Sequence, residues 1–184
     1  VMSGIRKLDS GPITAIRPQY TIENPGFDRG IELWDFDFGN WVYDPNPLVG
    51  HWMPGTLATT ADGTIQNITS SLIDVEEGWD FSASCYVKWD DLIATSGAAL
   101  QLNVTTLLDG EIVGNDTLDV IDHADWAGLE AGDWTQLTGS YTVPAGVNGV
   151  KVRITVNDNA TSGDVHFDSV TVWSEDDTEG TVYK

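Results

Sequence analysis

The side chains that most often perform covalent chemistry are few in this sequence, and they form no catalytic pattern. The single cysteine, Cys85, lies among alternating apolar residues, which predicts a buried thiol rather than a nucleophile. Cysteine and histidine show no zinc-ligand spacing, and neither a phosphate loop nor a nucleophile elbow occurs. Glycoside hydrolysis needs two carboxylates about 5–10 Å apart, but 29 acidic residues will supply such a pair by chance. We therefore expect a protein that is not an enzyme.

Alternating apolar and polar residues recur along the chain at the spacing of short antiparallel strands. The alternation is clear at residues 81–89, 100–105, 137–143 and 150–156. In the first of these segments the odd-numbered residues are apolar and should face a core, which leaves Tyr86 on the opposite face. Gln101, Asn103 and Arg153 fall on the polar faces of their strands in the same way.

Turn-forming residues separate these segments, since Gly supplies positive φ and Asp or Ser caps nearby amides. They occur at 61–63, 77–78, 109–110, 144–146 and 162–164. A single helical turn is expected, around residues 124–131. Many short strands with one buried face apiece predict an all-β fold, a β-sandwich of two antiparallel sheets. A chain of 184 residues suits one such domain.

The charge of the chain is strongly negative, with 29 acidic residues against 8 basic ones and a net charge of −21. Such a field repels nucleic acid and anionic lipid, because phosphate attraction dominates binding to both. No apolar run approaches the roughly 20 residues that a membrane-spanning helix needs. We therefore expect neither nucleic-acid binding nor membrane insertion.

The N-terminal segment differs from the rest in charge. Residues 1–20 contain Arg6, Lys7 and Arg17 against Asp9, a net charge of +2. Pro residues in this segment favour an extended conformation that cannot become a helix. We expect an extended basic arm at 1–21, a sandwich at 22–173 and an acidic tail at 174–184. The arm could dock on a second copy of the chain or on a particle subunit, or it could simply be a loose terminus.

Four segments resemble, in order along the chain, the carbohydrate-binding modules of families 4, 9 and 22. They are NPGFDRG at 24–30, FSASCYVKW at 81–89, WTQLTGSYTVPAGVNGVKVRITV at 134–156 and VHFDSVTVW at 165–173. The resemblance rests on the ordered set and covers roughly residues 22–173. It implies a jelly-roll sandwich whose concave face binds a glycan chain. It also implies that Trp41 and Trp134 pack in the core, where strand register already places Trp89.

The same resemblance implies a structural calcium ion between the segment after the first glycine and the final strand. Asp28 stands where the family has an acidic residue in the first segment, and Asp168 stands for the acidic residue of the final strand. Calcium takes six to eight oxygen ligands, so carbonyl groups and water must complete the set. The alternative is that each carboxylate only caps a turn.

A sugar-binding surface needs an aromatic face for the apolar side of a pyranose ring, and amides or charges for its hydroxyls. Tyr86, on the polar face of its strand, and the loop residues Trp52 and Trp126 are the candidates for stacking. The polar groups that back them are expected from Gln101, Asn103 and Arg153. The alternative for Trp52 and Trp126 is that they close the open ends of the sandwich.

Three functions follow from these residues, in descending order. The first is a non-catalytic binding or adhesion module that recognises carbohydrate, outside the cell or on a virus surface. The second is a capsid decoration, spike or tail component of a virus particle without glycan binding, because this fold serves unrelated functions. The third is a glycoside-active enzyme.

Overall fold

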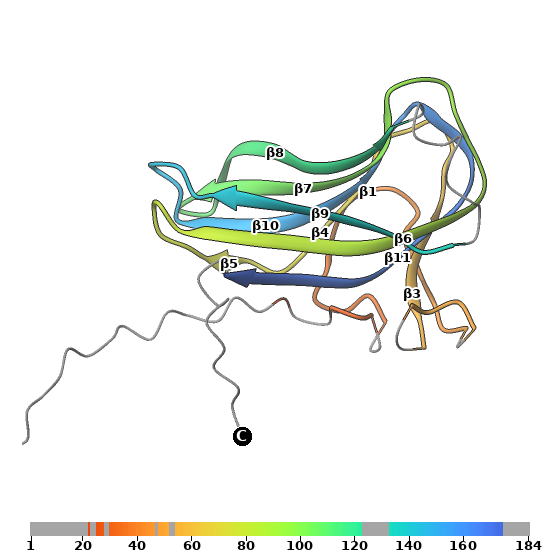
Figure 1. Cartoon of the computed structure of the whole chain (residues 1–184), viewed down its shortest axis with the longest axis horizontal. Helices are drawn as coiled ribbons and strands as arrows, with labels where there is room; N and C mark the ends of the chain where they lie inside the picture. The colour runs from red at the N-terminus through yellow and green to blue at the C-terminus, as the bar shows by residue number, and fades with distance from the viewer. Residues whose placement is uncertain are drawn as a thin grey trace, which may run out of the picture.

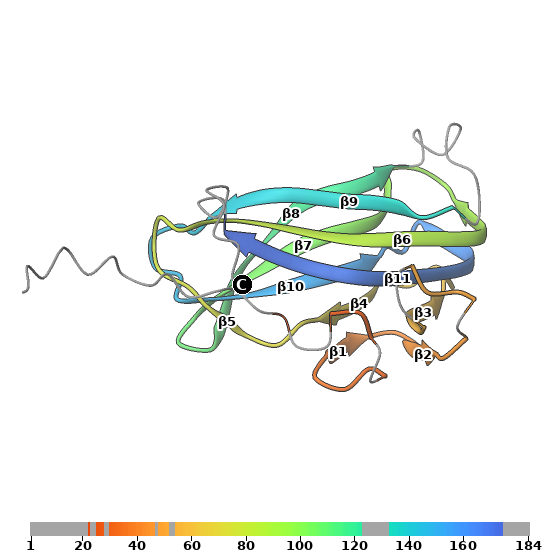
Figure 2. The ribbon, with the colours of Figure 1, turned by 60° about the horizontal axis from the view of Figure 1, so that its bottom comes forward.

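The computed structural model describes residues 22, 25–27, 30–46, 48–51, 54–122 and 133–174, and its strands form two antiparallel sheets packed face to face (Figures 1 and 2). The six-stranded sheet has the order β1 (Asp35–Phe38), β4 (Gln66–Thr69), β10 (Gly149–Val156), β7 (Ala98–Leu108) and β8 (Glu111–Asp122), with the short β5 (Ile73–Asp74) also paired to β10. The five-stranded sheet has the order β2 (Val42–Asp44), β3 (Thr56–Thr60), β11 (Ala160–Ser174), β6 (Asp80–Ala94) and β9 (Thr135–Thr142). The expected all-β sandwich is confirmed.

The core lies between the two sheets and consists of the apolar residues of the alternating segments. Cys85 is fully buried in β6, and Trp89 of the same strand is 2% exposed. Facing them in the other sheet, the fully buried residues include Leu102 of β7 and Ile154 of β10. Strand register therefore assigned the inward faces correctly. Within the part of the chain that the structure describes, no helix is long and apolar enough to cross a membrane.

The β7–β8 hairpin turns at Asp109 and Gly110, as expected. Both residues have positive φ, 52° and 87°, the conformation that two-residue hairpin loops require.

The expected turn at 162–164 is wrong, because β11 continues through it. Gly163 has a φ of 106°, and a Cβ there would lie 2.6 Å from the backbone nitrogen of Leu92 in β6. The pairing of β6 with β11 shifts register at this point, so the glycine forms a bulge in a long strand. A glycine inside a strand pattern is typical of a bulge with close backbone approach.

The free edges of the two sheets meet along β8 and β9. Asp119 of β8 accepts a hydrogen bond from the backbone N–H of Thr138 at 2.9 Å, and Asp116 accepts one from the Tyr141 hydroxyl at 3.0 Å. Burial, followed by the bond to Asp116, raises the pKa of Tyr141 to about 12. A Cβ on Gly139 would lie 2.8 Å from the carbonyl oxygen of Leu118, so the glycine allows this close approach.

Several expectations concern residues outside the described ranges. These are the basic arm at 1–21, the tail after 174, the helical turn at 124–131, and the candidate residues Asp28, Trp52 and Trp126.

Candidate functional site

The outer face of the six-stranded sheet carries a continuous set of amide and hydroxyl side chains, which we call the polar face. The pairing of β4, β10, β7 and β8 brings alternate residues of the four strands onto this side, opposite the core. Its members are Asn67, Thr69, Gln101, Asn103, Thr105, Asn115, Thr117, Arg153 and Thr155. The sequence reasoning proposed three of these nine as binding residues, Gln101, Asn103 and Arg153, and alternation also turned Thr155 outward; the other five were missed as site residues.

A chain of hydrogen bonds crosses the polar face from β8 to β4. The Thr117 hydroxyl donates to Asn103 Oδ1 at 2.8 Å, and Asn103 Nδ2 donates to Thr155 Oγ1 at 3.0 Å. The Thr155 hydroxyl then donates to Asn67 Oδ1 at 2.8 Å. Every bond runs in the same direction, which holds each amide and hydroxyl in one orientation. The central side chains are therefore preorganised.

The smaller side chains of the polar face are nearly buried between longer ones. Asn67, Asn103 and Thr155 point away from the core, yet they are only 1%, 6% and 4% exposed. Gln101 and Arg153, on the neighbouring positions of β7 and β10, are partly exposed. A ligand on this face would meet these longer side chains first.

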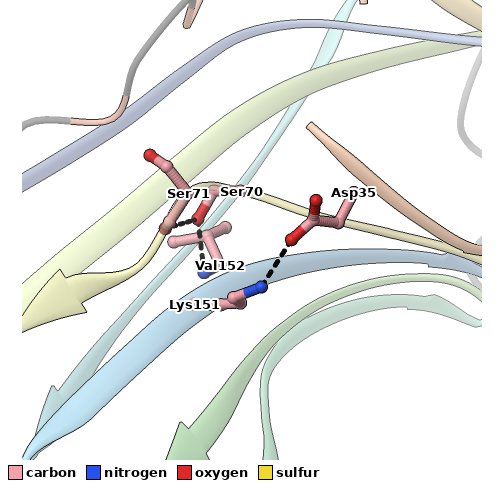
Figure 3. A network of polar contacts seen from close by, with 5 residues as sticks. All are labelled: Asp35, Ser70, Ser71, Lys151 and Val152. Carbon is pink, nitrogen blue, oxygen red and sulfur yellow. Dashed lines mark hydrogen bonds and ion pairs between the residues drawn. The ribbon is translucent and has the colours of Figure 1, made fainter. Parts of the chain in front are cut away.

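Two cations stand on β10 next to one another, and they differ in their partners. Lys151 Nζ lies 2.6 Å from Asp35 Oδ2, an ion pair between β10 and β1 (Figure 3). Arg153 Nη1 instead donates to the side-chain oxygen of Asn115 at 3.0 Å. The Nε of Arg153 is buried and has no hydrogen-bond partner. Lys151 is thus neutralised by a carboxylate at the margin of the face, whereas Arg153 stands among amides and hydroxyls.

The position of both cations depends on how β10 is held where β4 ends. Val152 donates its backbone N–H to Ser70 Oγ at 3.0 Å (Figure 3), and Ser70 donates its own N–H to the Val152 carbonyl at 2.8 Å. The Ser70 hydroxyl donates in turn to the Ser71 carbonyl at 2.9 Å. These contacts hold Val152 inward, and alternation then turns its two neighbours outward.

Tyr86 lies on the outer face of the other sheet. Its ring stacks on His51, with centroids 3.7 Å apart, and His51 also meets the edge of Trp134 at 5.4 Å. Lys88 Nζ lies 5.0 Å from the centroid of the Trp134 ring. The expectation that Trp134 packs in the core is therefore wrong: it is half-buried on the outer face, since it precedes β9 in the outward register.

The structure consequently separates the described candidates for sugar binding into two groups. Gln101, Asn103 and Arg153 come together on the polar face, whereas Tyr86 is on the opposite side of the sandwich. The expected single site, with Tyr86 backed by the three polar residues, is wrong. The residues are separated because β6 and β7, although consecutive in the chain, belong to different sheets.

A hollow of about 470 Å³ lies beside β2, β3 and β11. Its lining includes Asp44, Asp164 and His166. His166 Nδ1 is 3.1 Å from the Thr56 hydroxyl, and burial lowers the pKa of this histidine. The hollow is thus lined by carboxylates and a histidine that favours its neutral form.

Asp168, the predicted calcium ligand of the final strand, is fully buried. Its Oδ2 accepts the backbone N–H of His51 at 2.7 Å, and its Oδ1 accepts that of Ser169 at 2.6 Å. The segment at 25–27 lies beside it, because Val170 donates its N–H to the Pro25 carbonyl at 2.9 Å. A Cβ on Gly26 would be 3.9 Å from Asp168 Oδ1.

The expected neighbourhood of the first segment and the final strand is therefore present, and a buried carboxylate suits a cation there. Phe27 and Ser169, which flank this neighbourhood, both have a φ of 53°. Among the residues that the structure describes, no group of three or more His, Cys, Asp or Glu could hold a metal. A calcium ion would thus depend on further oxygen ligands.

Solved structures with this architecture include carbohydrate-binding modules, which makes the fold their jelly-roll sandwich. The family 22 module with the family 10 module of Clostridium thermocellum endo-1,4-beta-D-xylanase 10B, complexed with xylohexaose, has a TM-score of 0.58 at 17% identity, over 85% of this chain and 28% of that one. The TmCBM61 complex with beta-1,4-galactotriose has a TM-score of 0.56 at 12% identity, over 86% and 99%. The enzymatically active domain of tailspike protein 4 of bacteriophage CBA120 has a TM-score of 0.58 at 14% identity, over 84% of this chain and 21% of that one.

These identities establish the fold alone. The chain spans 21% of the enzymatically active tailspike domain and 28% of the xylanase structure. No protein-family model matches the sequence, and a search of curated proteins finds no match.

Proposed function

We propose that this chain is a non-catalytic module that binds polysaccharide through the polar face. The observation that carries the proposal is the directed hydrogen-bond chain from Thr117 to Asn67, with Gln101 and Arg153 above it. Sugar hydroxyls both donate and accept, so they match the accessible side chains around this nearly buried chain, which are Gln101, Asn115, Thr117 and Arg153. The likeness to xylohexaose- and galactotriose-bound structures supports the same ligand class.

The composition of the polar face also supports a binding role without catalysis. Glycoside hydrolysis requires two carboxylates across a cleft. In the described part of this face, Asp35 is at the margin and is paired with Lys151, while amides and hydroxyls occupy the centre.

A glycan array followed by titration calorimetry tests the proposal and locates the site. We expect Gln101→Ala to weaken binding about tenfold, the effect of roughly one or two lost hydrogen bonds. Tyr86→Ala serves as the matched change on the opposite sheet, and Trp52→Ala and Trp126→Ala test the remaining candidates for stacking. If Tyr86→Ala abolishes binding and Gln101→Ala does not, the glycan site lies on the five-stranded sheet instead. If no polysaccharide binds the folded protein, the proposal fails.

Calcium at the junction of the first segment and β11 is part of the proposal, with Asp28 and Asp168 as side-chain ligands. A buried carboxylate needs hydrogen bonds or a counter-charge, and the ion would add to the contacts that Asp168 already makes, the N–H groups of His51 and Ser169 among them. After thorough chelation, added calcium should raise the melting temperature by mass action. Asp168→Asn should remove that response; an unchanged melting temperature in the native protein would argue for turn capping instead.

Display on a larger extracellular or viral assembly is a second proposal. The likeness to a phage tailspike favours it, as does the basic arm on an acidic chain. Native mass spectrometry of the full chain and of a variant without residues 1–20 tests it. A closed assembly that dissociates after the deletion would support attachment through the arm, whereas a monomer in both cases would contradict self-association.

A further inference from the structure

Arg153 differs in its contacts from the other two cations that the structure describes. The described residues contain three cations, Lys88, Lys151 and Arg153. Lys151 is paired with Asp35, and Lys88 lies over the Trp134 ring. No ion pair involves Arg153 in the part of the chain that the structure describes. Carboxylates are abundant, since the chain has 29 acidic residues, yet none of the described ones forms an ion pair with Arg153.

The surroundings of Arg153 supply few acceptors for its donors. A guanidinium has five N–H donors and stays charged at every physiological pH. Of these, Nη1 has an acceptor in Asn115, and the bond is exposed to solvent. The Nε–H is buried without an acceptor. On either side, register places Thr69 of β4 and Asn103 of β7, and neither can neutralise the charge.

We infer that the polar face selects an acidic polysaccharide, with the carboxylate of a uronic acid residue bound at Arg153; the inference rests on the proposed glycan binding. The flat guanidinium matches a carboxylate with two parallel hydrogen bonds, and such charged bonds are stronger than neutral ones. The hydroxyls of the same sugar would meet Gln101 and Asn115. Of the two described cations on this side of the sheet, Lys151 has a carboxylate partner and Arg153 has none. An anionic group of a ligand therefore gains the most electrostatic stabilisation at Arg153.

The net charge of −21 does not prevent this selection. At 0.15 M salt the Debye length is about 8 Å, so distant carboxylates act weakly on a ligand that contacts Arg153. Asp35, at the margin of the face, is already held by Lys151 at 2.6 Å. Binding should therefore persist at physiological salt, where long-range repulsion is screened.

The test compares polysaccharides that differ only in the acidic group. Polygalacturonate, alginate and glucuronoxylan would each be titrated in 0.15 M salt beside the same polymer with its carboxyl groups reduced to alcohols. We expect at least one uronate polymer to bind about ten- to a hundredfold more tightly than its reduced form, which corresponds to one charged hydrogen-bonded pair. This comparison needs no change in the protein.

Variants then identify the residue. Arg153→Gln should abolish the difference in affinity between the uronate polymer and its reduced form, because the uronate loses a charged pair whereas the reduced form loses only neutral hydrogen bonds. Lys88→Gln removes the same charge from the opposite sheet and should alter affinity less than about threefold, since its effect is only long-range. Arg153→Lys keeps the charge without the planar fork and should be intermediate. Melting curves confirm that each variant is folded.

The outcomes separate this inference from the proposed function. Equal affinity for uronate and reduced polymers overturns the acidic selection while glycan binding stands. Equal losses with Arg153→Gln and Lys88→Gln also overturn it, because they indicate a general charge effect. Absence of binding to every acidic and neutral polymer overturns both.

Discussion

The hydrogen-bond chain of the polar face can be tested through stability with Thr155→Val. The substitution keeps the shape of a side chain that is 4% exposed, but it removes the hydroxyl that accepts from Asn103 and donates to Asn67. Each hydrogen bond contributes about 1 kcal/mol net, and the higher strand propensity of Val offsets part of the loss. We expect the free energy of unfolding to fall by about 1–2 kcal/mol, and the melting temperature by about 2–8 °C.

The matched control is Thr69→Val on the neighbouring strand. Thr69 is 3% exposed on the same face, and its hydroxyl makes no side-chain hydrogen bond to the residues that the structure describes. Its replacement should change stability by less than about 0.5 kcal/mol. Urea denaturation followed by tryptophan fluorescence measures both variants. If the two lose the same free energy, the directed chain contributes nothing beyond ordinary burial, and the reasoning is refuted.

A double-mutant cycle sharpens the same test, because Thr117 and Thr155 act on opposite ends of Asn103. Combining Thr117→Val with Thr155→Val should give a coupling free energy of at least about 0.5 kcal/mol, since residues in one network are not additive. If the losses in unfolding free energy of the two single variants simply add, Asn103 does not couple Thr117 to Thr155.

Three further predictions concern backbone strain, pH and the thiol. Gly163→Ala should lower the free energy of unfolding, measured by chemical denaturation, by about 2–5 kcal/mol, because Gly163 has a φ of 106° and a Cβ there would clash with Leu92. Gly78→Ala is the control: Gly78 has a φ of 81° but nothing within 4 Å of an added Cβ, so this variant should lose only about 1–2 kcal/mol. Burial lowers the pKa of His166, so the unfolded chain binds its proton more tightly, and stability should fall as pH drops from about 6.5 toward the lower folded value; His166→Gln should flatten that slope. Burial raises the pKa of Cys85, so a thiol reagent should label it only after unfolding, and rapid labelling of the native protein would contradict the assigned core.

Alternation in the sequence was sufficient to assign most side chains to an inner or outer face. It placed Cys85 and Trp89 in the core, and it turned Gln101, Asn103 and Arg153 outward. This succeeds because the side-chain period of a strand is two whatever its partners are. The Asp109–Gly110 hairpin was equally local, since positive φ at both positions is a property of the turn itself.

The sequence did not determine which outer faces belong together. Tyr86 and Gln101 are 15 positions apart and both point outward, but β6 pairs with β11 and β9, while β7 pairs with β10 and β8. Apart from β8, which follows β7 across the Asp109–Gly110 turn, those partners lie far along the chain. They are selected by packing of the whole core, so no local pattern encodes them. The separation of Tyr86 from the polar candidates on different sheets, and the absence of an ion pair between Arg153 and a described carboxylate, are therefore properties of the tertiary structure.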